Sequence, residues 1–308
     1  MSAGSGDSHL SKAERRSAAR EKARQLREEQ KKKERRNRFL IQGGIIVAIL
    51  AVIAVVALVI VNAVRPPASG PQNMLSDGIK IGENFEAVRT PGLRPGAEPV
   101  PAQTNEPDVL DIKIWVDYMC PFCGGFERAN AEQLSQLVGS GSATLEVHPI
   151  SFLDRASAGT QYSTRAANAA ACVANYSPDK FFAFNQLLFA NQPEEGTAGL
   201  SNDELIELTQ QVGVSRANDI VQCVESQKFK SWVKGATDRA LNGPVAGTEL
   251  EKIQGTPTVL VNGQQYQYTV DPQTGEFDPD EFARFLTQVL GSQFIEEPTP
   301  TPTPPAGG

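Results

Sequence analysis

Two cysteines separated by two residues form the most reactive segment of the chain, the Cys-Pro-Phe-Cys run from Cys120 to Cys123. Pro121 suits the first position of a helix because its fixed φ matches the helix and its missing N–H would have no partner there. Cys120 then caps the helix, where unpaired backbone N–H groups and the positive end of the helix dipole favour a thiolate. The pKa of Cys120 should therefore fall below that of a free cysteine. We predict a redox centre with Cys120 as the nucleophile and Cys123 as the resolving thiol.

A zinc site is the alternative use of such a pair, and it needs further ligands at suitable spacing. The chain has only one pair of this kind, because Cys172 and Cys223 stand apart in the sequence. The two histidines are His9, in a basic segment, and His148, which either flanks the redox pair or ends a strand. No ligand spacing favours zinc, and we predict no metal site.

Strand-like and helix-like patterns alternate around the cysteine pair, as is typical of a mixed α/β domain. A strand is predicted over 112–118, directly before the pair, and a helix over 120–137 follows. The remaining predictions are a strand over 144–150, helices over 163–175, 179–190, 202–212, 216–226 and 228–241, a hairpin of strands 258–261 and 265–270 joined by Asn262-Gly263, and a helix over 278–290.

Composition divides the 308-residue chain into five parts, and charge is unevenly spread over them. The net charge is −7, but residues 1–38 carry +7 and the remainder carries −14. The predicted parts are a basic tail at 1–38, an apolar segment at 39–64, a Pro/Gly-rich linker at 65–108 with a candidate edge strand at 78–82, a globular domain at 109–295, and a Pro/Thr-rich disordered tail at 296–308.

The apolar segment at 39–64 contains no charged residue, and about 20 such residues are enough for a helix to span a bilayer. It is longer than the apolar core of a secretory signal peptide, so we predict an uncleaved transmembrane anchor. Basic residues precede it, which by the positive-inside rule places the N-terminus in the cytoplasm and everything after residue 65 outside. The basic tail is then a solvated topogenic segment, with binding to anionic lipid or nucleic acid as the alternative.

An extracytoplasmic location makes the other two cysteines interpretable, because disulfides persist in oxidising compartments. If Cys120 pairs with Cys123, then Cys172 and Cys223 remain, and we assign them to a structural disulfide. Such a bond would close a loop of about 50 residues and stabilise the fold by roughly 4 kcal/mol. Two unpaired buried thiols are the competing interpretation.

A second motif, Gly-Thr-Pro-Thr at 255–258, stands directly before a predicted strand, where a proline is tolerated. Together with the cysteine pair it resembles the thioredoxin superfamily, in which a proline at this place is cis and lies against the redox motif. The resemblance implies that Thr256 and Pro257 form a ledge for an extended substrate strand. It also makes Pro121 and Phe122 candidate substrate-binding residues.

Within that superfamily, the helices between the second strand and Thr256 look like the insertion of the DsbA branch, the disulfide-forming enzymes of bacterial envelopes. Segments 114–123, 148–151 and 166–169 are also similar. The resemblance covers 109–295 and implies a thioredoxin-like α/β fold with an all-α insertion at about 152–245. Phe122 departs from the pattern, because the branch commonly has a histidine there.

Glu127 lies seven residues after Cys120 and shares its helix face. In similar enzymes an acidic residue here shuttles a proton to or from the resolving thiol, so the resemblance makes Glu127 a candidate catalytic residue. A plain surface carboxylate is the alternative.

The resemblance implies a membrane-anchored thiol-disulfide oxidoreductase that introduces disulfides into secreted or envelope proteins. It also implies a membrane partner that reoxidises the cysteine pair, and it indicates no organic cofactor and no nucleic-acid partner. Two other functions remain open: an isomerase or reductase with the same chemistry, and a redox-inert binding module of the envelope.

Overall fold

The computed structural model describes residues 12–63, 69–271 and 276–293 of the chain. The chain divides into two compact units, residues 1–65 and 66–308, each of which is described here by itself. The predicted C-terminal tail at 296–308 lies outside the described residues.

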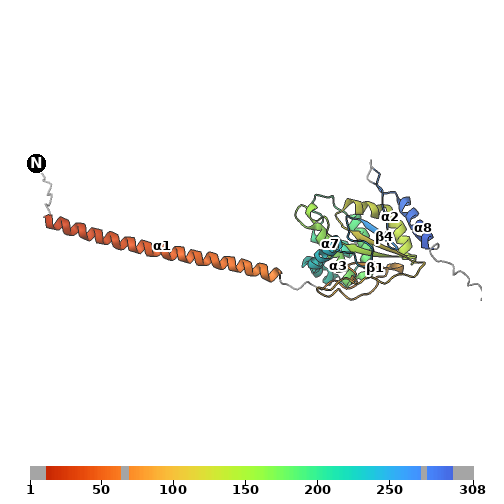
Figure 1. Cartoon of the computed structure of the whole chain (residues 1–308), viewed down its shortest axis with the longest axis horizontal. Helices are drawn as coiled ribbons and strands as arrows, with labels where there is room; N and C mark the ends of the chain where they lie inside the picture. The colour runs from red at the N-terminus through yellow and green to blue at the C-terminus, as the bar shows by residue number, and fades with distance from the viewer. Residues whose placement is uncertain (1–11, 64–68, 272–275, 294–308) are drawn as a thin grey trace, which may run out of the picture. The chain divides into compact units, whose positions relative to one another are not determined.

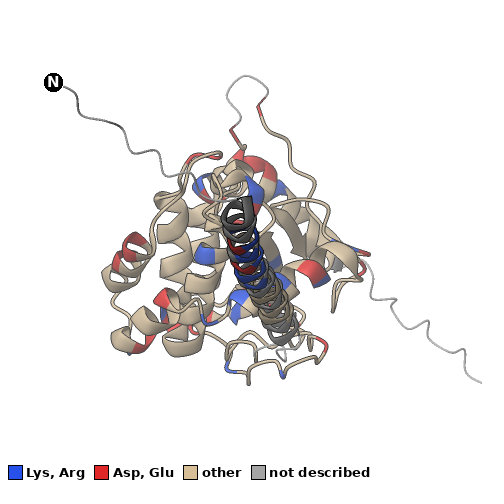
Figure 2. Ribbon diagram, turned by 90° about the vertical axis from the view of Figure 1, so that its left-hand side faces the viewer, with Lys and Arg blue, Asp and Glu red and all other residues tan. Residues whose placement is uncertain are grey.

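The first unit is described as one 52-residue helix, α1 (Lys12–Ala63). Its first part is rich in Ala, Arg, Lys and Glu, which favour helix, whereas the residues after Arg38 carry no charge (Figures 1 and 2). Among the residues that the structure describes, no helix combines the length and apolar character needed to cross a membrane. The predicted span at 39–64 is therefore not confirmed, and several side chains within it lie outside the described ones.

The second unit is built on a five-stranded sheet with the order β1-β3-β2-β4-β5 (Figure 1). The strands are β1 (Ile79–Ile81), β2 (Leu110–Val116), β3 (Ala143–Pro149), β4 (Thr258–Val261) and β5 (Gln264–Gln265). Only β2 and β3 are parallel, and helix α2 (Pro121–Gly139) connects them, as a parallel pair requires. The other neighbouring strands run antiparallel. This arrangement confirms the predicted thioredoxin-like α/β core.

Alternate residues of β2 enter two different apolar clusters, because successive side chains of a strand point to opposite faces. Ile112 and Ile114 lie in the large core, which also contains Phe126 of α2 and Phe282 of α8 (Pro279–Gln293). Trp115 lies in a smaller cluster with residues of the 240–253 region. Both faces of the central strand are therefore covered.

Five helices lie between β3 and β4, which confirms the predicted all-α insertion. They are α3 (Tyr162–Tyr176), α4 (Phe181–Ala190), α5 (Asn202–Gln211), α6 (Ala217–Glu225) and α7 (Lys230–Asn242), and we call them the helical block. Cys172 of α3 and Cys223 of α6 form a disulfide with a Cα–Cα distance of 5.9 Å, as expected from the sequence. Helix α5 begins with the Ser201–Glu204 capping box that its sequence predicts.

The segment 65–108 is not the predicted spacer, because its described residues, 69–108, belong to the folded domain. Met74 and Leu93 are buried, and β1 pairs antiparallel with β3 as the expected edge strand. Asn73 Nδ2 donates a hydrogen bond to the carbonyl of Ala174 in α3 (2.8 Å). The high proline and glycine content thus reflects turns that bring a few apolar side chains into the core, and the domain begins well before residue 109.

The predicted hairpin after β4 is shorter than expected. Asn262 and Gly263 have the positive φ values (48° and 81°) that a two-residue turn requires, but β5 ends at Gln265. Tyr266 N–H still donates to the Val259 carbonyl of β4 (2.9 Å), and the chain then leaves the sheet. The Tyr266 and Tyr268 rings pack into an aromatic cluster, with ring centroids 5.0 Å apart for Tyr266–Phe282 and 4.9 Å for Tyr268–Phe277. Beyond Tyr266, aromatic packing against Phe277 and α8 takes the place of further strand pairing.

We expect the Cys172–Cys223 disulfide to be a major source of stability. Replacing both residues with alanine should lower the free energy of unfolding by about 4 kcal/mol, because the bond closes a loop of 51 residues in the unfolded chain. Urea denaturation should be measured in a Cys120→Ser/Cys123→Ser background, which prevents thiol exchange and serves as the matched control. An unchanged unfolding midpoint would contradict a structural role for this bond.

Candidate active site

Cys120 stands at the junction between β2 and α2, where the sequence places the redox motif. Residues 117–120, which we call the redox loop, lead from the end of β2 to the helix. Cys120 is the N-cap of α2, with φ −74° and ψ 117°, and Pro121 occupies the first turn. The first helical bond runs from Gly124 N–H to the Cys120 carbonyl (3.2 Å), and Cys120 N–H donates to the Asp117 carbonyl (3.0 Å). Cys120 thus occupies the predicted N-cap position.

The two thiols are free and buried, with exposed fractions of 5% for Cys120 and 2% for Cys123. The pKa of Cys120 is lowered to about 7, first by a hydrogen bond from the Cys123 thiol and also by the backbone N–H groups of Cys123 and Phe122, while burial opposes the shift. Burial and the hydrogen bond with Cys120 raise the pKa of Cys123 well above its usual range. Cys120 is therefore the more readily ionised of the two thiols.

The Thr256–Pro257 peptide is cis and lies beside the redox pair, as the resemblance implies. The Cys120 thiol donates a hydrogen bond to the Thr256 carbonyl (3.2 Å), and both Thr256 and Pro257 are buried. Trp115 of β2 pairs with Thr258 of antiparallel β4, so the start of β4 meets the end of β2. This pairing brings together two motifs that are 136 residues apart in the sequence.

Two aromatic side chains are exposed at this edge of the sheet. Phe122, inside the motif, is 48% exposed, and Phe152, three residues after the end of β3, is 41% exposed. Pro121 is also exposed. Parallel β2 and β3 end at the same edge, and the Leu153 N–H donates to Asp117 Oδ2 (2.7 Å), which ties the segment after β3 to the redox loop. Sequence reasoning found Phe122 and missed Phe152, whose only signal is an aromatic residue shortly after a strand.

Asp117 is a buried carboxylate that sequence reasoning also missed. It is fully buried, and its two oxygens accept hydrogen bonds from the backbone N–H groups of Met119 (2.8 Å) and Leu153 (2.7 Å). Burial raises its pKa to about 6, although these N–H groups act in the opposite direction. Asp117 therefore braces the turn that leads to Cys120. A single carboxylate at the end of an otherwise apolar run was the available signal.

Glu127 lies in the second turn of α2 and is 9% exposed. Burial raises the pKa of this carboxyl to about 7. This pKa is close to that of Cys120, which is also about 7. This buried environment contradicts the alternative of a plain surface carboxylate.

The helical block also contacts the redox loop through residues that sequence reasoning missed. Gln192, just after α4, donates hydrogen bonds from Nε2 to the carbonyls of Cys120 (2.8 Å) and Tyr118 (3.2 Å). The Tyr118 hydroxyl donates to Asn185 Oδ1 of α4 (3.0 Å). A glutamine on a loop carries no signal that sequence alone could recognise.

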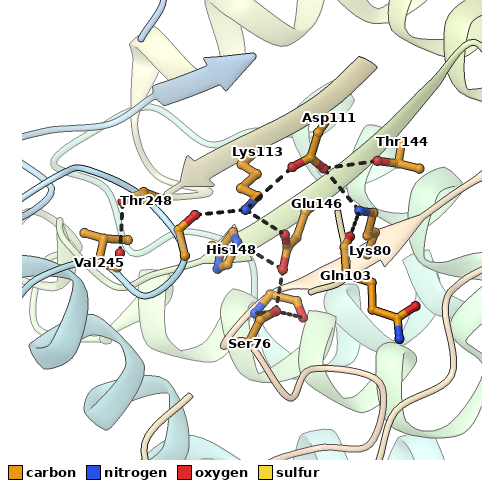
Figure 3. Close-up of polar contacts among 12 residues, drawn as sticks. Ser76, Lys80, Gln103, Asp111, Lys113, Thr144, Glu146, His148, Val245 and Thr248 are labelled. Atoms are coloured by element: carbon orange, nitrogen blue, oxygen red, sulfur yellow. Dashed lines mark hydrogen bonds and ion pairs between the residues drawn. The ribbon is translucent and has the colours of Figure 1, made fainter. Parts of the chain in front are cut away.

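His148 lies next to the last residue of β3, which agrees with the alternative that it ends a strand. It stacks on Trp115 with ring centroids 4.4 Å apart, and its Nε2 lies 3.5 Å from a Glu146 carboxylate oxygen. Figure 3 shows His148 and Glu146 within a group of polar side chains on the sheet that also includes Lys113 and Asp111. Burial lowers the pKa of His148.

Comparisons with solved structures agree with this geometry. Reduced DsbA from Mycobacterium tuberculosis is 27% identical with a TM-score of 0.51, and the alignment covers 71% of this chain and 98% of that one. Reduced DsbG, a disulfide bond oxidoreductase from the same organism, is 27% identical with a TM-score of 0.51, covering 71% of this chain and 93% of that one.

Among curated proteins, the serine/threonine-protein kinase PknE of Mycobacterium tuberculosis is 35% identical over 119 residues. The match covers 37% of this chain and 21% of the kinase, so the chain spans about a fifth of the length of the curated relatives it matches.

The thioredoxin family model matches residues 107–286, which is more than half of the chain. The matched range contains the cysteine pair, the helical block and the cis-proline. Because this match covers more than half of the chain and includes the parts that build the site, the chain belongs to the thioredoxin family.

Proposed function

We propose that this chain is a thiol-disulfide oxidoreductase that introduces disulfides into secreted or cell-envelope proteins. The observation that best supports this proposal is the arrangement of two cysteines at a helix N-terminus beside a cis-proline. The pKa of Cys120 is lowered, whereas Cys123 is buried and its pKa is raised. A stabilised Cys120 thiolate favours the reduced enzyme, which makes the disulfide form an oxidant. Similarity to DsbA and DsbG supports this chemistry.

The reaction begins with the Cys120–Cys123 disulfide. A client thiolate attacks Cys120 Sγ, forming a mixed disulfide while the bond to Cys123 breaks and Cys123 takes up a proton. The client's second thiolate then attacks the client sulfur of this mixed disulfide and releases Cys120 as a thiolate. The client gains a disulfide, and its two electrons remain on the two enzyme thiols.

Glu127 supplies the proton that Cys123 needs in the first step and removes it on reoxidation. A carboxyl with a pKa near 7 is protonated and deprotonated in comparable amounts at neutral pH, as a general acid and base should be.

The client binds as an extended strand along Thr256 and Pro257, with its backbone hydrogen-bonded at the Thr256 peptide. Exposed Pro121 and Phe122 contact the side chains next to the client cysteine. No organic cofactor takes part, because the two cysteines carry the electrons, and a membrane oxidase accepts these electrons to restore the disulfide.

The second candidate is a disulfide isomerase or reductase. It uses the same thiol-disulfide exchange, but it starts from the reduced cysteine pair and attacks a client disulfide. The match to DsbG equals the match to DsbA in identity and TM-score, and Phe122 stands where the DsbA branch commonly has a histidine. The reduction potential distinguishes the two, since about −120 mV is typical of DsbA and about −270 mV of thioredoxin.

The proposed location is the outer face of the cytoplasmic membrane, with α1 as the anchor. Support comes from the uncharged segment at 39–64 and from its apolar side chains, of which Leu40, Val47 and Val52 are more than half exposed. Exposed apolar surface of this extent is typical of a membrane or protein contact. The Cys172–Cys223 disulfide also fits an oxidising compartment.

The reactivity of Cys120 should follow the ionisation of its thiol. Iodoacetamide labelling of the reduced protein should accelerate as the pH rises through about 7, because the thiolate is the reacting species and the pKa is lowered to about 7. Mass spectrometry should place the label on Cys120, and a Cys120→Ser variant is the control. A midpoint at the pH expected for a free thiol, about 8.5, would exclude the proposed thiolate stabilisation.

Mixed disulfides with clients should accumulate when the resolving thiol is absent. In a Cys123→Ala variant expressed in cells, Cys120 should remain linked to client cysteines, and non-reducing gels with mass spectrometry should identify these clients. The matched Cys120→Ala variant should trap none. An oxidoreductase should lose its biological role when Cys120 is replaced with serine. Full retention of that role in Cys120→Ser would instead identify a redox-inert module.

Membrane attachment should depend on the apolar character of α1. The full chain should stay in the membrane fraction after alkaline carbonate extraction, and Leu50→Lys with Ile53→Lys should release it, because each charge opposes insertion by roughly 3 kcal/mol. Val88→Lys with Val100→Lys, at exposed positions of the second unit, adds the same charge as a control. Release of the unsubstituted chain would rule out a membrane-spanning anchor.

A further inference from the structure

We infer that Gln192 is a positioning residue that holds the redox loop in the geometry that stabilises the Cys120 thiolate. The inference rests on the proposed function only in taking Cys120 as the reactive thiol. It assigns to the helical block a direct effect on the chemistry of the cysteine pair, in addition to its part in the fold.

The first observation is a pair of hydrogen bonds from one side-chain amide. Gln192 Nε2 donates to the Cys120 carbonyl at 2.8 Å and to the Tyr118 carbonyl at 3.2 Å. A primary amide has two N–H groups, so it can satisfy both acceptors at once. The two carbonyls belong to the redox loop on either side of Met119, and Gln192 therefore fixes the orientation of the loop just before the helix begins.

The second observation is the close approach of Gln192 to the backbone of α2. A Cβ atom at Gly124 would overlap Gln192 Oε1, so the amide fits only because residue 124 is a glycine. Gly124 N–H donates the first helical bond to the same Cys120 carbonyl that Gln192 contacts. On the next residue, a Cβ at Gly125 would lie 2.8 Å from the Phe277 ring. Gln192 and Phe277 thus both pack closely against glycines near the start of α2.

The electrostatic consequence follows from what the first turn does. The N–H groups of Phe122 and Cys123 lower the pKa of Cys120, and they act only while they point at its sulfur. Their direction is set by the peptide planes that begin at the Cys120 carbonyl. Gln192 has no charge, so it stabilises the thiolate by holding this carbonyl and not by its own field.

The neighbouring residue provides a matched control. Asn191 also donates a side-chain amide hydrogen bond to a backbone carbonyl, from Nδ2 to Leu187 (2.9 Å), but this bond stays within the end of α4. Asn191→Met and Gln192→Met therefore each remove one amide at adjacent positions, and only the second removes a contact with the redox loop.

The experiment measures the Cys120 pKa from the pH dependence of iodoacetamide labelling in the full chain, together with its reduction potential against glutathione. Gln192→Met should raise the Cys120 pKa by about half to one unit, so that the thiolate fraction at pH 7 falls roughly two- to fivefold. Asn191→Met should leave the pKa unchanged, although it can lower the melting temperature.

An unchanged Cys120 pKa and potential in Gln192→Met would overturn the inference, and so would equal shifts in both variants. If Gln192→Met does not fold, Gln192→Glu keeps the size and planar shape of the side chain and should raise the pKa further, because its carboxylate cannot donate and adds a like charge near the thiolate. No shift in Gln192→Glu would equally overturn it. An ordinary thiol pKa in the unsubstituted protein would instead contradict the proposed function, so the two failures are distinguishable.

Discussion

The stabilisation of one sulfur anion is the constraint on which the rest of the site depends. The Cys120 thiolate is held by the Cys123 thiol and by N–H groups of the first helical turn, in a location from which water is largely excluded. Burial alone would raise the pKa of Cys120, so the hydrogen bonds must exceed the desolvation penalty for the pKa to reach about 7. Small changes in donor geometry therefore translate directly into changes in reactivity.

Three parts of the chain hold this geometry from different directions. The central strand β2 delivers the redox loop, and Asp117 braces the loop by accepting the N–H groups of Met119 and Leu153. The cis-proline segment closes one side through the Thr256 carbonyl, and the helical block closes another through Gln192. Through Gln192 the insertion therefore contacts the candidate active site directly.

The local elements of the core could be predicted because their signals are local. The strand before the cysteines, the Pro121 helix start and the alternation of strands and helices follow from periodicity and capping, and the family resemblance supplied the cis-proline. The contacts of Asp117 and Gln192 could not be predicted, because each depends on chain segments distant in sequence that only tertiary structure brings together. The linker at 65–108 was misjudged for the same reason: its few apolar residues become meaningful only once β1 pairs with β3.

A group of polar side chains around Lys113 connects the central strand to the segment before the cis-proline. Lys113 of β2 lies 3.6 Å from Asp111 and 3.9 Å from Glu146, and its Nζ also donates to the Gly247 carbonyl (3.3 Å; Figure 3). Buried ion pairs add little net stability, but they favour one arrangement because an unpaired charge would be strongly unfavourable. Gly247 belongs to the segment that leads from α7 to Thr256. Lys113 therefore links β2, which leads into the redox loop, to the segment that leads to the cis-proline, so that both parts of the site are held by the same strand.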